Sequence, residues 1–302
     1  MNNNRQQRHK GLVIALHANF YQVRLCKEDL NEELNGVNEL LCTARTRLSQ
    51  KGERIYVGDQ VEIEAIDWKE KRAIVVAIAP RLGILKRPMV ANCTKLVIVI
   101  SLMQPAVDAN QLSRFLLSAE TTDLPIDIAF SKSDLVDFSL AEQWQKRVER
   151  WGYNSFLVSS LNNVGIEQLR HSLDDSPISV ICGPSGVGKT SLINSLIPSL
   201  DLKVGAVSGR LQRGRHTTRH VQLFPIGNGG MIADTPGFNR PTLPKDPRKL
   251  GWLFPEIRSA FIEKPCRFRN CLHQNELGCT VGTNWDRYTF YTQSLESLLS
   301  PH

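Results

Sequence analysis

The sequence has no apolar run that approaches the roughly 18 residues needed to cross a membrane, which argues against a membrane-spanning protein. Its first 10 residues are polar and basic and lack the apolar core of a secretory signal. The 7 cysteines form an odd and unevenly spaced set, which argues against a disulfide framework. We therefore expect a cytoplasmic protein without a membrane partner.

Acidic residues are absent from one long segment. Residues 202–233 contain no Asp or Glu, but they contain five basic residues: Lys203, Arg210, Arg213, Arg215 and Arg219. The whole chain carries a formal net charge of +7. This clustered excess favours an anionic partner such as nucleic acid, the alternative being an ordinary solvated surface.

The 302 residues are enough for two or three domains, and the first 80 have the texture of short strands. Apolar and β-branched residues gather in five segments separated by turn-rich or charged stretches: residues 11–16, 21–25, 40–46, 60–66 and 73–78. Five short strands at this spacing predict a small β-barrel, with an oligonucleotide-binding (OB) barrel as the leading type.

From about residue 95 the pattern changes to buried parallel strands that alternate with helices. The predicted strands are 96–100, 126–130, 156–158, 180–182 and 231–233. The predicted helices are 111–120, 140–151, 166–173 and 189–196. This alternation predicts an α/β doubly wound domain. Five prolines between 236 and 255 mark a boundary near residue 240, where a small tail begins.

The segment G-P-S-G-V-G-K-T at 183–190 fits the phosphate-loop pattern G-x-x-x-x-G-K-[ST] at every fixed position. It follows a predicted strand and precedes a predicted helix, as the motif requires, which argues against a chance glycine-rich turn. The residues expected to bind the nucleotide here are Gly183, Pro184, Ser185, Gly186, Val187, Gly188, Lys189, Thr190 and Ser191. Lys189 should reach the β- and γ-phosphates, and the Thr190 hydroxyl should bind Mg²⁺.

A second motif, D-T-P-G at 234–237, follows a later apolar strand. Asp234 can hold Mg²⁺, and the Gly237 N–H can contact the γ-phosphate. Between the two motifs lie Thr217 and Thr218, which can complete the Mg²⁺ coordination in the GTP state. The alternative is a basic loop with incidental threonines.

GTPases read guanine with N-K-x-D, which ordinarily comes after the phosphate loop, and nothing after Gly237 fits this pattern. Upstream, however, a predicted strand ends in S-K-S-D, which comprises Ser131, Lys132, Ser133 and Asp134. A later strand leads into Ser159 and Ser160, which fit the second base-contacting loop. The motif order therefore indicates a circular permutation, which a doubly wound sheet permits because chain ends lie at the surface.

Three cysteines and one histidine lie close together near the end of the chain: Cys266, Cys271, His273 and Cys279. Three thiolates and one imidazole suit a closed, tetrahedral structural Zn²⁺ site. Such a site can supply on the order of 10 kcal/mol of folding free energy to a segment too small for its own core. Unrelated cysteines and a surface histidine are the alternative. Arg267 and Arg269, placed among the ligands, favour a face turned toward RNA phosphate.

With these motifs in this order, the chain resembles the RsgA (YjeQ/YloQ) family of small ribosomal subunit biogenesis GTPases over nearly its whole length. The resemblance implies an OB-type barrel at 1–80, a circularly permuted GTPase domain at 81–240 and a zinc-binding helical domain at 241–302. It also implies a late assembly factor that binds the small subunit and its rRNA near the decoding region. Such a factor hydrolyses GTP to GDP, is stimulated by the subunit, and then leaves.

Two positions depart from the usual GTPase pattern. Ser131 replaces the Asn of N-K-x-D, and from this we expect weaker guanine affinity while Asp134 still discriminates against adenine. Phe238 stands where many GTPases carry a water-orienting Gln, so intrinsic turnover should be slow. His216 is the best internal candidate for the missing group, although a role in RNA contact or mere solvation is as well supported.

Two other functions remain open at this point. A P-loop ATPase or kinase is disfavoured by Lys132 and Asp134. An RNA-binding protein that uses nucleotide only as a structural switch at a degenerate site gains some weight from Ser131 and Phe238, whereas the intact Lys189 and Thr190 oppose it. Nothing in the sequence indicates an oligomer, so a monomer is expected.

Overall fold

The structure is a computed structural model that describes residues 8–26, 38–50, 52–86, 88–200, 202, 221–227, 229–234, 244 and 246–300. The chain forms two compact units. The first comprises Met1–Thr94, Leu173–Val180 and Lys203–Gly237, and the second comprises Lys95–Ser172, Ile181–Leu202 and Phe238–His302. Each unit is thus assembled from stretches that are far apart in the sequence.

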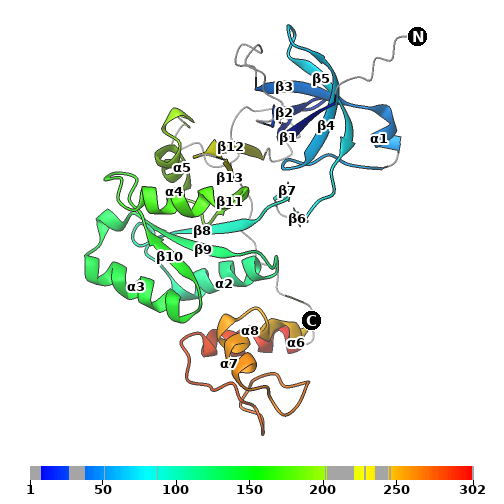
Figure 1. Cartoon of the computed structure of the whole chain (residues 1–302). Coiled ribbons are helices and arrows are strands. Elements are labelled where there is room, and N and C mark those ends of the chain that lie inside the picture. Colours follow the sequence, from blue (N-terminus) through cyan, green and yellow to red (C-terminus); the bar gives the residue numbers. More distant parts are fainter. Residues whose placement is uncertain are drawn as a thin grey trace. The chain divides into compact units, whose positions relative to one another are not determined.

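Five strands of the first unit close into a barrel (Figure 1). They are β1 (His9–Leu16), β2 (Tyr21–Leu25), β3 (Glu39–Ala44), β4 (Gln60–Asp67) and β5 (Arg72–Ile78). Strand β1 pairs antiparallel with both β2 and β4. Strand β2 also pairs antiparallel with β3, β3 pairs parallel with β5, and β5 pairs antiparallel with β4, so the five strands form a closed ring. Alternate apolar side chains fill the interior, with Val13, Val23, Ile63 and Val75 all at 0% exposure. The predicted OB-type barrel is confirmed.

The segment after β3 corrects one predicted boundary. Strand β3 ends at Ala44, and Thr46 begins the short helix α1 (Thr46–Gln50), so extending the strand through Thr46 was wrong. The turn forms because the Leu48 N–H donates to the Arg45 carbonyl at 2.9 Å. The Leu48 side chain joins the barrel core. A tertiary contact therefore overrides a local strand preference here.

Two further pairs of strands belong to the first unit. Strands β6 (Ile84–Lys86) and β7 (Met89–Ala91) form a small antiparallel sheet. Strands β12 (Gln222–Ile226) and β13 (Gly230–Asp234) pair antiparallel, and β12 also meets β1 at Ala15. Only β13 was expected from the sequence.

In the second unit, β8 (Lys95–Ser101), β9 (Ile126–Ser131) and β10 (Asn154–Leu157) form a parallel sheet. Helix α2 (Ala109–Glu120) packs on β8, and α3 (Phe138–Arg150) packs on β10. Along the chain, helix α4 (Ile166–Asp174), strand β11 (Ile178–Cys182) and helix α5 (Lys189–Leu196) follow, and the segment Leu173–Val180, which covers the end of α4 and the start of β11, belongs to the first unit. The predicted alternation of strands and helices is confirmed, with boundaries displaced by no more than a few residues.

The end of the chain is a small helical domain within the second unit (Figure 1). Its helices are α6 (Pro247–Gly251), α7 (Pro255–Glu263) and α8 (Tyr288–Leu299). Its apolar core is built around Leu250, Phe254 and Tyr291, and Leu117 from α2 packs into the same cluster. Among the described residues, no helix is both long enough and apolar enough to span a membrane.

Asp59 lies just before strand β4 and is fully buried, at 0% exposure. Its carboxylate accepts hydrogen bonds from the Arg81 guanidinium at 2.6 and 2.8 Å and from the Tyr56 N–H at 2.7 Å. The Asp59 carboxylate is buried, whereas the Arg81 side chain is 24% exposed. Removal of Asp59 would therefore leave an unpaired Tyr56 N–H and a partly solvated cation, so this position is sensitive to mutation.

We predict that Asp59→Ala lowers the free energy of unfolding by about 1–3 kcal/mol, because the Tyr56 N–H and the partly exposed Arg81 guanidinium lose their acceptor. Denaturant unfolding monitored by circular dichroism measures the loss. The control is Arg8→Ala, which breaks the exposed Arg8–Glu62 pair and should cost less than about 1 kcal/mol. Equal losses in the two variants would contradict the prediction.

Candidate functional site

The phosphate loop lies between β11 and α5, and its glycines are required by geometry. Gly183 has a φ of +145°, and a Cβ added there would lie 2.1 Å from the Val99 carbonyl oxygen of β8. Gly188 has a φ of +89° and stands as the N-cap of α5. Only glycine combines such dihedral angles with so close an approach of two backbones. The loop can therefore turn tightly from the strand into the helix.

Lys189 is folded into this loop. Its side chain is only 8% exposed, and its ammonium group donates to the carbonyl oxygens of Gly183 at 2.9 Å and Pro184 at 2.6 Å. Ser185 and Gly186 are exposed at the tip of the loop, and Thr190 and Ser191 are half-buried in the first turn of α5. The loop thus has a cation at its centre and the N-terminus of a helix behind it, an arrangement that favours an anion.

The carboxyl end of β9 is joined directly to the phosphate loop. The Ser131 hydroxyl donates to the Val187 carbonyl at 2.5 Å, and Ser131 is only 5% exposed. The Lys132 ammonium donates to the Gly186 carbonyl at 2.9 Å and also to the Gln104 carbonyl. Two consecutive side chains of the base-reading motif therefore hold two consecutive carbonyls of the phosphate loop. The lost Asn carboxamide does not remove the contact with this loop, because the shorter Ser131 side chain makes one.

The two predicted base-contacting loops also meet. The Ser159 hydroxyl donates to Asp134 Oδ1 at 2.6 Å, and the Ser133 N–H donates to the Val158 carbonyl at 3.2 Å. Asp134 is exposed and Ser159 is buried, so a fixed hydroxyl orients an accessible carboxylate. Ser160 follows directly and is half-buried. The structure thus brings 131–134, 159–160 and 186–188 together within one unit.

Several expected residues lie outside the described part of the chain. They are His216, Thr217 and Thr218, together with Gly237 and Phe238. The backbone of Asp234 is described as the last residue of β13, but its side chain is not. The expected roles of these residues remain predictions.

The four candidate metal ligands form a compact group. The ligand atoms of Cys266, Cys271, His273 and Cys279 all lie within 4.8 Å of one another. The Nδ1 atom of His273 lies 3.6 Å from the Cys266 sulfur and 3.7 Å from the Cys279 sulfur, and these two sulfurs are 3.9 Å apart. Tetrahedral Zn²⁺, with bonds of about 2.3 Å to sulfur and 2.0 Å to nitrogen, requires ligand separations of about 3.5–3.8 Å. The donor set and the spacing of these three atoms therefore fit this ion.

Glu276 organises the loop that carries two of these ligands. Its carboxylate accepts from the backbone N–H groups of Leu272 and Gln274, each at 2.7 Å, and Cys271 Sγ lies 3.4 Å away. Burial disfavours the Glu276 carboxylate, but these backbone hydrogen bonds outweigh it and lower its pKa. Burial also lowers the pKa of His273, which favours the neutral imidazole that a metal ion needs.

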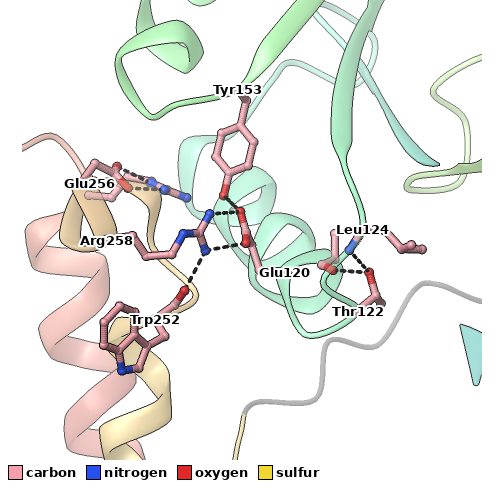
Figure 2. A network of polar contacts seen from close by, with 9 residues as sticks. Glu120, Thr122, Leu124, Tyr153, Trp252, Glu256 and Arg258 are labelled. Carbon is pink, nitrogen blue, oxygen red and sulfur yellow. Dashed lines mark hydrogen bonds and ion pairs between the residues drawn. The ribbon is translucent and has the colours of Figure 1, made fainter. Parts of the chain in front are cut away.

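A polar network joins the helical domain to the GTPase-like core (Figure 2). The Arg258 guanidinium of α7 donates to the Glu120 carboxylate at the end of α2, at 2.6 and 3.2 Å. The Tyr153 hydroxyl donates to the same carboxylate at 2.8 Å, and Arg258 also donates to the Trp252 carbonyl at 2.6 Å. The Glu120 carboxylate at the end of α2 thus contacts both α7 and the residue that precedes β10.

Arg287 makes a second connection beside this network. It is 2% exposed and forms a bidentate pair with Glu256 of α7 at 2.8 and 2.5 Å. Its guanidinium lies 4.8 Å from the ring centroid of Trp151, which follows α3, and 5.0 Å from that of Phe254. Burial favours loss of the proton, but the bond to Glu256 outweighs it and raises the pKa of Arg287. The C-terminal domain is therefore anchored on α2 and α3.

Sequence reasoning did not identify these supporting residues. Glu276 could have been suspected from its place between His273 and Cys279. In the sequence, Glu120, Glu256 and Arg287 look like any charged residue on a solvated surface. Only the packing shows that Glu120 pairs with Arg258 and that Glu256 pairs with Arg287. Outside the cluster of four candidate ligands, Cys42, Cys93 and Cys182 are buried, whereas Cys26 is half-buried.

Comparisons with known proteins agree with this arrangement. The family model described as RsgA GTPase matches residues 72–244. The small ribosomal subunit biogenesis GTPase RsgA of Synechococcus sp. (strain CC9311) is 50% identical over 294 residues, which is 97% of this chain and 95% of that protein. The protein of the same name from Thermosynechococcus vestitus (strain NIES-2133 / IAM M-273 / BP-1) is 46% identical over 288 residues, covering 95% of this chain and 81% of its own.

Two solved structures resemble the whole chain. YjeQ from Thermotoga maritima has a TM-score of 0.79 and 28% sequence identity, and the match covers 98% of this chain and 100% of that one. YloQ, described as a circularly permuted GTPase, has a TM-score of 0.77 and 27% identity, with coverage of 100% and 99%. The permuted order of motifs is therefore shared with YloQ.

We predict that Gly183→Ala lowers the free energy of unfolding by about 3 kcal/mol or more, because the new methyl group meets the Val99 carbonyl at 2.1 Å. The matched control is Gly186→Ala in the same loop. Gly186 also has a positive φ of +81°, but nothing lies within 4 Å of an added Cβ, so only about 1 kcal/mol should be lost. Denaturant unfolding compares the two, and similar losses would argue against the close approach of β8.

Proposed function

This chain belongs to the RsgA family of small ribosomal subunit biogenesis GTPases, and from that premise we propose how its own residues perform the reaction. It hydrolyses GTP to GDP and phosphate and acts in the biogenesis of the small ribosomal subunit. The observation that carries the nucleotide site is the contact of Ser131 and Lys132 with the Val187 and Gly186 carbonyls. The P-loop ATPase and the degenerate-site protein are not favoured.

The phosphates of GTP would bind in the loop 183–190. Backbone N–H groups and the N-terminus of α5 offer positive potential there. Lys189 now donates to two carbonyls of its own loop, so its ammonium is already positioned at the loop's centre. In the complex it would exchange these neutral acceptors for phosphate oxygens, with which charge-assisted hydrogen bonds are stronger.

Guanine would be read by Asp134. Its carboxylate can accept hydrogen bonds from the ring and exocyclic N–H groups of guanine, and Ser159 holds it in place at 2.6 Å. Adenine presents a mismatched edge, and an unpaired polar group costs about 1–3 kcal/mol. We retain the prediction that guanine affinity is weakened by Ser131, because its hydroxyl proton is donated to the Val187 carbonyl.

Magnesium would accompany GTP. The hydroxyl of Thr190, in the first turn of α5, and the carboxylate of Asp234 are hard oxygen ligands of the kind that this ion prefers. Thr217 and Thr218 would complete the set in the GTP state. Bound Mg²⁺ supplies neutralisation of the charge that develops on the β- and γ-phosphates.

Hydrolysis requires an oriented water, and this chain has Phe238 where a Gln is common. We propose that basal turnover is slow and that binding to the small subunit supplies or orders the missing group, with His216 as the internal candidate. The cluster Cys266, Cys271, His273 and Cys279 would hold one structural Zn²⁺, which leaves no open coordination position for catalysis.

The remaining expectations concern context. We place the domains at 1–80, 81–240 and 241–302. The partners are the small ribosomal subunit with its rRNA, together with GTP and GDP. The protein would act as a monomer in the cytoplasm, where these partners are found.

We predict that purified small ribosomal subunits raise the rate of GTP hydrolysis at least about tenfold, whereas large subunits do not and ATP is not hydrolysed. Phosphate release measures the rate. Lys189→Ala should reduce it to background, while Lys146→Ala, which changes an exposed lysine on α3, should leave it unchanged. If the protein hydrolysed GTP but small subunits did not raise the rate, the assignment as a GTPase would stand and the role of the subunit would be rejected.

We predict about one zinc ion per chain, measured by elemental analysis of the purified protein. Cys279→Ser should lose the ion and unfold the helical domain, since the metal contributes on the order of 10 kcal/mol to its folding. Cys26→Ser is the control, because Cys26 is a half-buried cysteine outside the cluster and should leave the zinc content unchanged. Full zinc content in Cys279→Ser would exclude this ligand set.

A further inference from the structure

The loop between the first two cluster cysteines exposes an aromatic ring between two arginines. Arg267, Phe268 and Arg269 lie between Cys266 and Cys271, and all three are exposed. We call these three residues the zinc-loop surface. The proposed zinc site explains why the flanking cysteines are held together, but it does not explain what lies between them.

Phe268 is not part of the domain's core. Its side chain is 49% exposed, whereas Phe254 and Phe290 in the same domain are at 0% and 9%. The Arg267 guanidinium lies 5.4 Å from the ring centroid of Phe268. A single exposed apolar residue is ordinary, but an exposed aromatic ring with a guanidinium over one face and a second arginine next to it in the sequence is a combination that suits nucleic acid.

The charge of this surface is uncompensated. Residues 264–275 contain no Asp or Glu, and the nearby Glu276 is engaged by backbone N–H groups of the ligand loop. In the part of the chain that the structure describes, neither Arg267 nor Arg269 forms an ion pair, whereas Arg258 and Arg287 of the same domain do. The zinc-loop arginines are therefore available to an external anion.

The loop is also held in shape. The Arg267 N–H donates to the Gly278 carbonyl at 2.9 Å, and the Cys271 N–H donates to the Phe268 carbonyl at 3.3 Å. Gly278 has a φ of +84°, and a Cβ there would lie 2.8 Å from the Arg267 Cβ. A surface fixed in this way loses little conformational entropy when it binds a partner.

We propose that the zinc-loop surface binds an unpaired nucleotide of RNA, with the Phe268 ring stacked on the base and Arg267 and Arg269 beside the flanking phosphates. This inference rests on the proposed function, since it names what the helical domain contacts on its ribosomal partner. A base inside a duplex does not expose its face to a side chain, whereas a looped-out or single-stranded base does. The arginines alone would serve any phosphate backbone, so Phe268 is the residue that selects unpaired RNA.

The test compares Phe268→Ala with the unaltered protein, using the full chain loaded with zinc. Affinity is measured for purified small subunits and for two labelled probes: a single-stranded RNA oligonucleotide and an RNA duplex of the same length. We expect about 5- to 150-fold weaker binding to single-stranded RNA, no more than about twofold change with the duplex, and weaker binding to the subunit. Basal GTP hydrolysis and zinc content should not change.

Four further variants refine this test. Phe268→Trp keeps the stacking surface and should restore the affinity for single-stranded RNA. Leu299→Ala removes an apolar side chain with a similar exposure, 50%, from α8 and should have no effect. Arg267→Ala and Arg269→Ala should each weaken the binding of both RNA probes. They should also reduce the dependence of affinity on salt concentration, since each phosphate contact releases counterions.

The outcomes separate this inference from the proposed function. Base stacking would be overturned if Phe268→Ala weakened the binding of both RNA probes equally, or if it did not weaken the binding of single-stranded RNA. Weaker subunit binding without any effect on the RNA probes would assign the surface to a protein partner and likewise overturn it. If the unaltered protein failed to bind small subunits, the proposed function would fall, whereas the comparison of the two RNA probes would still decide the stacking.

Discussion

Two side chains at the end of β9 hold two consecutive carbonyls of the phosphate loop, and the nucleotide site depends on these contacts. Ser131 donates to Val187 and Lys132 donates to Gly186. The base-reading motif and the phosphate loop are thereby fastened into one rigid piece, although more than 50 residues of chain separate them. Because hydrogen bonds act through space, the order in which the chain visits the two motifs does not matter, and this is why the site tolerates circular permutation.

The C-terminal domain belongs to the same unit as residues 131–134, the segment proposed to contact the base. Arg258 reaches Glu120 at the end of α2, and Arg287 lies on Trp151 just after α3. The Arg258–Glu120 pair is only partly buried, whereas the Arg287–Glu256 pair beside it is buried and would be costly to break. The helical domain thus has a second, non-covalent connection to the core besides the chain that follows D-T-P-G.

Much of the architecture was predictable because it follows from short-range rules. Strand periodicity predicted the barrel, alternating apolar runs predicted the doubly wound core, and glycine spacing predicted the phosphate loop. The misses have physical causes as well. Helix α1 and strands β6 and β7 are too short to show a period, and α1 forms where Leu48 finds the barrel core. The partner of Ser131 could not be inferred from sequence, because a carbonyl group carries no residue-specific signal.

The sequence by itself determined the chemistry available to this protein: a lysine in a glycine-rich loop, an aspartate that can read guanine, and three thiols with an imidazole. These follow from residue type and local spacing. Only the tertiary structure decided how they are used. It placed Ser131 against the phosphate loop, Glu276 behind the metal ligands, Arg287 in an aromatic box, and Phe268 outside the core between two arginines. Such contacts join residues whose positions in the chain carry no information about each other, since packing alone brings them together.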